Sequence, residues 1–437
     1  MISTLRNYTQ LIIAPFNRVH ALFMGSSALV MLFPLISAPI VARLYTPEDF
    51  GIYAVFFALA TILSAISSLE LRNVALLESQ RVDGAHGALL AISIVTLFSL
   101  SLFVVILLFP KAWLTLILGA YIVPYLIWLP ISIFFMGTSQ VLYTWAIREK
   151  EYKLLARNKL VLGLVTMLLQ IGIGLMKPGP IGFITANLLG LLLSSFLLMF
   201  LFVQALRILK PSFGIRSAIT QFRKHYRLTV WTMPGALLNS LSQFLPDLLI
   251  NRFFGATLLG QYSLAVRMIN LPFSFMATSI QDFFRQQASE EFNNCGHCRT
   301  SFWRFFALTS TGAVLFILPI ILLVPYVFPV IFGSQWTEAG TLVQAVVLLT
   351  IVRFISSPLS YVWIIQGRQR LDFIWQIGLL AISLGTLLLP PFLIPEVSLY
   401  VTLWIYSLGT GAWYVLAITV SYLLSRHTAN EEIERAI

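Results

Sequence analysis

Residues 43–53 read RLYTPEDFGIY, and 209 positions later residues 252–262 read RFFGATLLGQY. In both stretches a long apolar run ends at the arginine, a short turn follows, and a second apolar run opens near the glycine. Four positions are identical in the two copies: Arg43/Arg252, Gly51/Gly260, Tyr53/Tyr262 and, upstream, Met24/Met233. Repetition at a fixed spacing indicates an internally duplicated architecture. The sequence therefore predicts two related halves of roughly 210 residues, each with a helix–loop–helix corner at this stretch.

The composition is that of a membrane protein. The 437 residues are 58% hydrophobic and only 10% charged, and the mean hydropathy is +0.88. A soluble chain of this length needs a polar surface that this composition does not supply. Apolar runs of about 20 residues, enough to cross the hydrocarbon core, recur along the whole chain. The chain is therefore expected to cross a membrane many times.

Twelve transmembrane helices are predicted. Helices are expected because every backbone N–H and C=O in lipid has to be hydrogen-bonded internally, and the two-residue alternation of a membrane barrel is absent. The predicted spans are 20–43, 50–71, 87–109, 121–147, 159–176, 181–206, 229–252, 258–280, 303–327, 340–366, 374–394 and 398–424. The fold class is thus all-α, with two six-helix halves.

Lysine and arginine set the orientation. Of the 28 basic residues, 22 fall in segments on the same side as the N-terminus, and four (Arg43, Lys111, Lys177 and Arg252) fall on the opposite side. Basic residues concentrate in cytoplasmic loops, so both termini are predicted to be cytoplasmic. The same bias explains the net charge of +11 without a nucleic-acid partner.

The domain organisation follows from these spans. Residues 1–19 form a cytoplasmic segment at the membrane surface, 20–206 an N-terminal six-helix bundle, 207–228 a cytoplasmic linker, 229–424 a C-terminal six-helix bundle, and 425–437 a cytoplasmic tail. Because each half has an even number of spans, the second half enters the membrane from the same side as the first. The repeats are therefore parallel, related by an axis along the membrane normal.

Three motifs resemble a known family. They are ARLYTPEDFGIYA at the end of the first span, SLELRNVALLES at the end of the second, and LYTWAIREKEYK after the fourth. They resemble the Wzx-type flippases of O-antigen and other polysaccharides, within the superfamily that also contains the MATE drug exporters and MurJ. The resemblance implies two six-helix bundles around a central cavity. It also implies that an undecaprenyl-pyrophosphate-linked oligosaccharide repeat unit is flipped across the bacterial inner membrane, in lipopolysaccharide or related glycan synthesis. The implied partners are this lipid-linked glycan, membrane lipid, and the polymerase and chain-length regulator of the same pathway.

Two arginines are candidates for the substrate cavity. Arg267 lies about 13 Å into the eighth span and Arg353 about 20 Å from the outer end of the tenth, at about 1.5 Å per residue. A charge at the bilayer centre costs at least about 2.5–3.5 kcal/mol and requires a compensating role. Arginine stays protonated and can bind a diphosphate through two parallel hydrogen bonds. The alternative is a structural arginine bonded to helix ends or to a neighbouring carboxylate.

Two acidic residues are candidates for ion coupling or gating. Asp247 follows Pro246 inside the seventh span, as a counter-ion for Arg267 or as a protonatable site. Glu70 and Arg72 close the second span, and residues two apart on a helix point in different directions. The family resemblance implies a gating or coupling role for Glu70, and the alternative is an ion pair at the membrane surface.

Helix-end positions complete the candidates. Arg43 and Arg252 are expected to anchor helix ends at the outer surface, with Glu48 and Asp49 in reach of Arg43, or to take part in an outward gate. Trp145 and Trp363 occupy matching places in the two halves and are candidates for stacking on sugar.

Enzyme chemistry is not indicated. The sequence has no glycine-rich phosphate loop, no nucleophile elbow and no histidine cluster with metal spacing, so no metal and no cofactor is expected. Cys295, His297 and Cys298 are too crowded for a tetrahedral zinc site. The rival functions are a MATE-type drug exporter or other secondary transporter and, from another class, a membrane O-antigen polymerase or ligase. The short outer loops argue against a polymerase or ligase, and two deep arginines favour an anionic cargo over a cationic drug.

Overall fold

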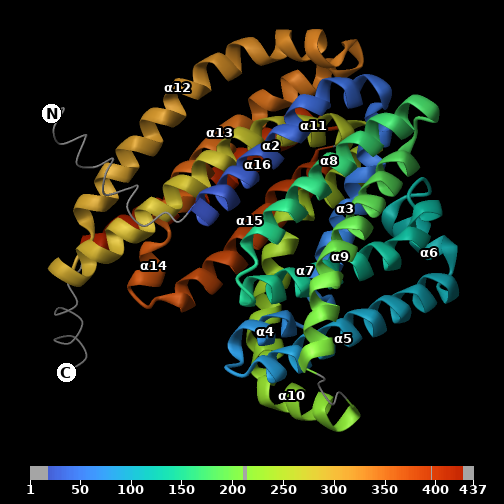
Figure 1. The fold of residues 1–437 in the computed structure, drawn as a ribbon. Helices are drawn as coiled ribbons and strands as arrows, with labels where there is room; N and C mark the ends of the chain where they lie inside the picture. The colour runs from blue at the N-terminus through green and yellow to red at the C-terminus, as the bar shows by residue number, and fades with distance from the viewer. Residues whose placement is uncertain (1–17, 210–213, 395, 427–437) are drawn as a thin grey trace. The chain divides into compact units, whose positions relative to one another are not determined.

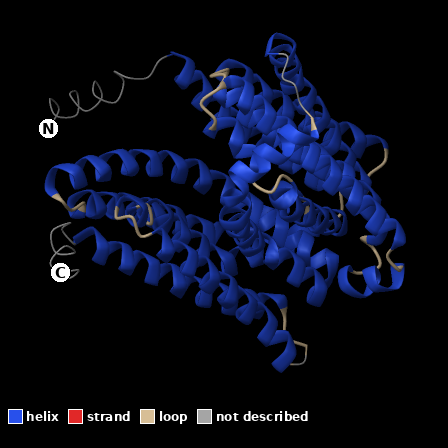
Figure 2. Ribbon diagram, turned by 90° about the horizontal axis from the view of Figure 1, so that it is seen from below, coloured by secondary structure: helices blue, strands red, loops and turns tan. Residues whose placement is uncertain are grey.

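The computed structural model describes residues 18–209, 214–394 and 396–426, and in this part of the chain every regular element is a helix (Figures 1 and 2). The predicted all-α class is therefore confirmed. Eight described helices are long and apolar enough to cross a membrane. The number of twelve spans stays a prediction. The predicted segment 1–19 and tail 425–437 lie outside the described residues, except for two residues of each.

The chain forms two compact units. Unit 1 contains the residues up to Val41, Leu63–Phe109 and Pro124–Pro234, and unit 2 contains Ala42–Ile62, Pro110–Val123 and the residues from Gly235 onwards. The division passes through α2 (Arg18–Leu44) and α3 (Pro47–Ser67), whose ends belong to different units. The predicted division into two six-helix bundles, 20–206 and 229–424, stays a prediction.

Unit 1 is built from long helices joined by short turns. Besides its parts of α2 and α3 it contains α4 (Val74–Leu77), α5 (Arg81–Leu108), α7 (Leu129–Arg148), α8 (Tyr152–Met176), α9 (Pro180–Leu209) and α10 (Ile215–Arg227). Three-residue η1 (Leu71–Asn73) leads into α4, and the π-helix η3 (Leu228–Thr232) follows α10. The helix α10 lies within the predicted linker 207–228 and is an element that the sequence prediction lacks.

Unit 2 holds most of α3 and the C-terminal helices. The C-terminal helices are α11 (Met233–Cys295, in unit 2 from Gly235), α12 (Arg299–Phe332), η4 (Ser334–Trp336), α13 (Thr337–Leu359), α14 (Val362–Ile365), α15 (Gln369–Leu393) and α16 (Leu399–Arg426). Unit 2 also contains the short helix α6 (Lys111–Leu118). The 63 residues of α11 contain the seventh and eighth predicted spans. They are separated at Gly255, whose φ of 85° and ψ of 172° interrupt the helix.

Local sequence signals fix the corner after α2. Pro47 opens α3, where its missing N–H costs nothing because the first helical N–H groups have no partner inside the helix. Thr46 and Asp49 cap this end: the Thr46 N–H donates to Asp49 Oδ2 (2.9 Å), and the Asp49 N–H donates to Thr46 Oγ1 (3.2 Å). The reciprocal pair is a capping box, which satisfies two otherwise unpaired donors.

The repeated glycines lie where α3 crosses α11. A Cβ atom added to Gly51 would collide with the backbone carbonyl of Ala256, and one added to Gly260 would collide with the backbone carbonyl of Pro47. At the offset of 209, Gly51 corresponds to Gly260 and Pro47 to Ala256. The two contacts are thus copies of one another, as at a local twofold axis, where each partner uses the same surface. Only glycine permits this approach, since both obstacles are backbone atoms.

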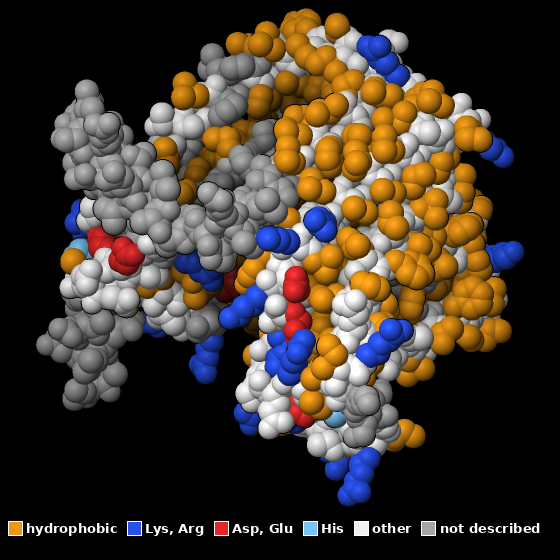
Figure 3. Space-filling model, viewed as in Figure 1, with side chains coloured by type: hydrophobic (Ala, Val, Ile, Leu, Met, Phe, Trp, Pro, Cys, Tyr) orange, Lys and Arg blue, Asp and Glu red, His pale blue; other side chains and the backbone are white. Residues whose placement is uncertain are grey.

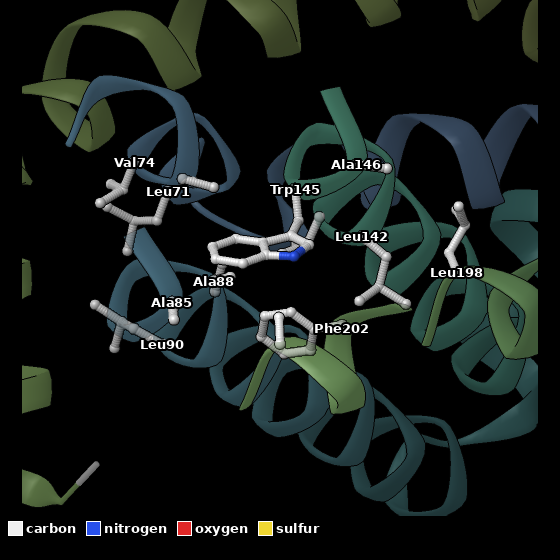
Figure 4. Packing of buried hydrophobic residues seen from close by; sticks show 14 of the residues in the cluster. Leu71, Val74, Ala85, Ala88, Leu90, Leu142, Trp145, Ala146, Leu198 and Phe202 are labelled. Atoms are coloured by element: carbon white, nitrogen blue, oxygen red, sulfur yellow. The ribbon is translucent and has the colours of Figure 1, made fainter. Parts of the chain in front are cut away.

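Each unit has its own apolar core. In unit 1, Trp145 and Phe202 pack edge to face with ring centroids 5.3 Å apart, surrounded by side chains of α4, α5, α7 and α9 (Figure 4). In unit 2, a cluster that includes Phe284, Cys298 and Phe302 joins the end of α11 to the start of α12. Within each unit, the close contacts between these buried apolar side chains stabilise the packing of the helices against one another.

Candidate functional site: a polar cavity in unit 2

Five helices of unit 2 (α11, α13, α14, α15 and α16) line a cavity of about 220 Å³. Amide side chains line the wall from α11, aromatic side chains line it from α15 and α16, and α13 contributes Arg353. A second cavity of about 290 Å³, between α11 and α13, shares Gln243, Gln281, Arg353 and Ser357 with the first. The side chain of Arg353 therefore lines both cavities.

The position of Arg353 is unusual for its helix. It lies about 24 Å along α13 from Thr337, at about 1.5 Å per residue. Its neighbours Thr350 and Phe354 are buried, whereas the Arg353 side chain is exposed to the cavities. Among the described residues, no carboxylate lies within 4.0 Å of its guanidinium. The cation is therefore available to an anion that enters the cavity.

Several buried polar atoms on the cavity wall lack a partner. Within the described part of the chain, Ser242 Oγ, Trp375 Nε1, Gln376 Oε1 and Thr410 Oγ1 make no hydrogen bond, although all four are buried. Buried polar groups are almost always hydrogen-bonded, by water if not by protein. The exposed amides of Asn239 and Gln243, which also line the cavity, carry both donors and acceptors and can hydrogen-bond water or the hydroxyl groups of a ligand.

Aromatic rings form one side of the first cavity. The Trp375 ring lies 5.1 Å from Tyr414 and 6.1 Å from Trp363, centroid to centroid, with steeply inclined planes. Trp363 Nε1 donates to Ser421 Oγ at 2.8 Å, which fixes that indole. The predicted stacking candidate Trp363 thus does line a cavity. Its counterpart Trp145 does not: it is fully buried in the unit 1 core, so the expectation of sugar stacking there is wrong.

Arg267 and Asp247 are on α11 but are not among the residues of that helix that line the two cavities. Arg267 is partly buried and within electrostatic range of Tyr53. It does not line the two cavities described above. Asp247 is partly buried and, like Arg353, lies within electrostatic range of Tyr406. No described basic side chain is within 4.0 Å of the Asp247 carboxylate, so the structure does not pair it with Arg267.

Glu70 and Arg72 point toward each other, contrary to the expectation from helical spacing. After α3 ends at Ser67, Leu69 (φ 50°) and Glu70 (φ 61°) are both left-handed and turn the chain into η1. Arg72 Nη2 donates to the buried Glu70 carboxylate at 2.7 Å, and Asn73 Nδ2 donates to its other oxygen at 2.7 Å. Arg72 also donates to Gln140 of α7. The expectation was wrong because the helix is interrupted between the two residues.

Arg43 bonds to a helix end rather than to the predicted carboxylates. Its Nη2 donates to the Val330 carbonyl near the end of α12 at 3.0 Å. Asp49 caps α3, and no described acidic group is within 4.0 Å of Arg43. Arg252 is exposed and within electrostatic range of Tyr121. The Tyr121 hydroxyl donates to Asn251 Oδ1 at 2.5 Å.

The cysteine motif belongs to the packing of the loop between α11 and α12. Cys298 is buried, and burial, with a smaller contribution from the Glu291 charge, raises the pKa of its thiol to about 12. The described residues contain no group of three or more side chains able to hold a metal ion.

The cavity residues from α15 and α16 are absent from the sequence prediction. Trp375, Gln376 and Thr410 carry no intramembrane charge, which is the signal that identifies Arg353. Polar side chains recurring on one face of an apolar helix are the only available clue.

Membrane-length helices around a polar cavity with one exposed arginine define a multi-pass membrane protein of the all-α class. The chain belongs to the polysaccharide biosynthesis protein family, whose model matches residues 40–341. Among curated proteins, the chain is similar to the teichuronic acid biosynthesis protein TuaB of Bacillus subtilis (strain 168). The two are 24% identical over 198 residues, which are 44% of this chain and 38% of TuaB, so the match spans less than half of either protein.

Solved structures share the fold at low sequence identity. The lipid II flippase MurJ in an inward closed conformation superimposes with a TM-score of 0.71 and 15% identity, over 93% of this chain and 90% of MurJ. An inward-facing MATE-family multidrug transporter gives 0.66 and 15%, over 91% and 94%. A transporter from Pyrococcus furiosus gives 0.58 and 16%, over 94% and 96%. The predicted MATE- and MurJ-like fold is therefore confirmed.

Proposed function

We propose that this protein is a flippase that moves undecaprenyl-pyrophosphate-linked oligosaccharide repeat units across the bacterial inner membrane. In this proposal it works by alternating access, coupled to an ion gradient, with both termini in the cytoplasm. It is a transporter and not an enzyme. Family membership supports a role in polysaccharide synthesis. MurJ, a lipid II flippase, has the same fold, and TuaB acts in teichuronic acid synthesis.

The observation that carries the proposal is the lining of the unit 2 cavity. Moving a hydrated sugar diphosphate through hydrocarbon costs tens of kcal/mol in the absence of replacement hydration. The exposed Arg353 offers a charged donor pair for phosphate oxygens, and the exposed amide side chains of Asn239 and Gln243 offer hydrogen bonds to sugar hydroxyls. An exporter of apolar cations has no use for such a lining.

The other candidates take roles in this cycle. Arg353 binds the anionic part of the substrate in the unit 2 cavity. Arg267 lines neither cavity, and its part in binding the anionic group stays a prediction. Asp247 and Glu70 serve ion coupling or gating: Asp247 lacks an ion-pair partner in the described chain, whereas Glu70 is held by Arg72. Arg43 and Arg252 anchor helix ends at the outer surface.

A complementation experiment tests the proposal. Deletion of the gene is expected to stop surface glycan synthesis while lipid-linked repeat units accumulate inside the cell. Arg353→Ala removes charge-assisted hydrogen bonds of about 1.5–3 kcal/mol, which corresponds to a roughly 10- to 100-fold weaker interaction with the substrate. This variant and Arg267→Ala should both fail to restore export at normal protein levels.

Arg299→Ala is the matched control, because Arg299 is an exposed arginine at the start of α12, away from the cavities. It should restore export fully. Normal export by both Arg353→Ala and Arg267→Ala disproves the cavity assignment. A deletion that changes drug tolerance and leaves surface glycan intact disproves the flippase function itself.

A further inference from the structure

The helix α10 carries an apolar stripe that the protein does not cover. Ile215, Ile219, Phe222 and Tyr226 follow one another at intervals of four, three and four residues, which places them on one face of the helix. All four side chains are exposed, Ile215 to 82%. Trp231, in the π-helix that follows, is 76% exposed. Water is an unfavourable environment for a continuous apolar face of this kind.

A row of arginines borders this stripe. Arg216, Arg223 and Arg227 are seven and four residues apart, so they share one face, next to the apolar one. All three are exposed, and no acidic side chain of the described chain is paired with them. In Figure 3, basic side chains gather at the end of the molecule where α10 lies, beyond a broad apolar surface.

The opposite face of α10 packs against the rest of unit 1. Lys224 Nζ lies 2.8 Å from Glu78 Oε2, and His225 Nε2 lies 2.7 Å from Glu78 Oε1. Glu78 is buried in the connection between α4 and α5, Gln221 is buried beside it, and Ala218 packs against the unit 1 core. The helix therefore has a defined orientation, and its apolar stripe faces away from the protein.

The connections at both ends of α10 are short. The membrane-length helix α9 ends at Leu209, six residues before Ile215, and the long helix α11 begins at Met233, six residues after Arg227. These short connections hold α10 near the level at which α9 leaves the hydrocarbon.

We propose that α10 lies in the membrane–water interface, with its apolar stripe in the acyl-chain boundary and its three arginines against anionic lipid headgroups. An amphipathic helix with basic residues beside its apolar face binds such surfaces by apolar burial and by electrostatic attraction. Charge complementarity selects anionic lipid as the occupant, since the exposed row is uniformly positive. The inference does not depend on the substrate, and the proposed orientation decides only which leaflet is contacted.

Spin-label accessibility in the full-length protein tests this placement. A label is attached through Phe222→Cys in a Cys295→Ser, Cys298→Ala background, and the protein is reconstituted into nanodiscs of phosphatidylcholine with or without phosphatidylglycerol. A label at residue 222 should collide with oxygen and be shielded from a water-soluble nickel reagent. A control label through Thr220→Cys, on the exposed polar side of the helix, should show the reverse.

The arginine row is tested by lipid preference. Each basic residue near an anionic surface contributes about a fivefold preference, so three give an upper bound on the order of 100-fold. The triple variant Arg216→Gln, Arg223→Gln, Arg227→Gln should strongly reduce the association of spin-labelled phosphatidylglycerol with the protein. The charge-matched control Lys153→Gln, Arg157→Gln, Arg299→Gln, at three other exposed positions, should not.

Three results overturn the proposal. A label at residue 222 that is open to the nickel reagent places the stripe in water. A label shielded from both oxygen and nickel shows that a protein surface, such as a second copy, covers the stripe. Equal lipid preference in the two triple variants shows that the arginines do not select anionic lipid.

Discussion

The contact between α3 and α11 gives a sharp test of the packing. In Gly260→Ala, the new methyl group meets the backbone carbonyl of Pro47, which cannot rotate out of the way as a side chain can. The two helices have to move apart, and the neighbouring contact of Gly51 with Ala256 is disturbed with them. The strain therefore falls on the packing of two helix backbones and cannot be relieved by the rotation of one side chain.

The expected loss of stability combines two opposing effects. Overpacking costs about 1–3 kcal/mol, and the upper end applies because the obstacle is backbone. Alanine is favoured over glycine in a helix by about 1 kcal/mol. The net destabilisation is about 2 kcal/mol. At an unfolding entropy of about 2 cal/mol/K per residue, this lowers the midpoint by roughly 2–4 °C, depending on whether the whole chain or unit 2 melts together.

Thermal unfolding of the purified protein in detergent, followed by tryptophan fluorescence, measures this change. Gly385→Ala in α15 is the matched control, because an added Cβ there meets no atom within 4 Å. It should leave the midpoint unchanged or raise it slightly. The double variant Gly51→Ala, Gly260→Ala should cost less than the sum of the single variants, since helices already separated by one methyl group accommodate the second more easily. Equal midpoints for Gly260→Ala and Gly385→Ala would refute the close approach of the two helices.

Three further predictions concern other contacts. Glu78→Gln should lower the thermal midpoint at neutral pH: burial alone raises the pKa of Glu78, but hydrogen bonds from Lys224 and His225 lower it overall. A carboxyl with a lowered pKa contributes stability above its unfolded pKa of about 4.3 and loses it as the pH falls through the folded value, so wild type and variant should converge in acid. A maleimide at pH 8 should modify one thiol per native chain, at the exposed Cys295, because Cys298 is buried and its pKa is raised to about 12; mass spectrometry reads the count. Trp336→Phe removes the 2.7 Å hydrogen bond from the buried indole to the Ala42 carbonyl, which keeps a 2.7 Å hydrogen bond from Gln335 Nε2, and should cost about 0.5–1.5 kcal/mol in the same melting assay.

Each of these predictions has a control. Glu149→Gln removes an exposed ion pair with Arg81 and should change the midpoint little at any pH; a Glu78→Gln effect of the same size at pH 7 and in acid contradicts the linkage. Modification of both cysteines in the native state contradicts the burial of Cys298. Trp113→Phe, at an exposed indole, should be neutral, and an equally stable Trp336→Phe shows that the hydrogen bond contributes nothing.

Much of the fold follows from local sequence. Bilayer-length apolar runs predict most helix positions, because lipid forces each run to close its own hydrogen bonds. The repeated glycines mark the crossing of α3 and α11, although the sequence indicates only that the stretch recurs. The helix α10 was also within reach, since the spacing of Ile215, Ile219, Phe222 and Tyr226 has the helical period.

The site was less accessible from sequence. Arg353 stands out because a charge in an apolar run is costly, and the structure does place its side chain at the cavities. The partners of charged groups could not be inferred: Arg43 bonds to Val330, 287 positions away, and Glu70 meets Arg72 because two successive residues are left-handed. Such pairings depend on tertiary geometry and on local backbone exceptions, neither of which periodicity encodes.

The boundary between the two units falls inside α2 and α3, and the chain also changes unit at residues 109–110, 123–124 and 234–235. In the proposed alternating-access cycle, a displacement of one unit relative to the other would therefore bend α2 and α3 as well as move these other connections. In α2, Pro39 lies two residues before Val41, the last residue that belongs to unit 1. The missing N–H of Pro39 removes one backbone hydrogen bond that would resist bending of the helix. Part of the resistance to this displacement would therefore come from helix backbone, and Pro39→Ala is expected to slow turnover without touching the cavity.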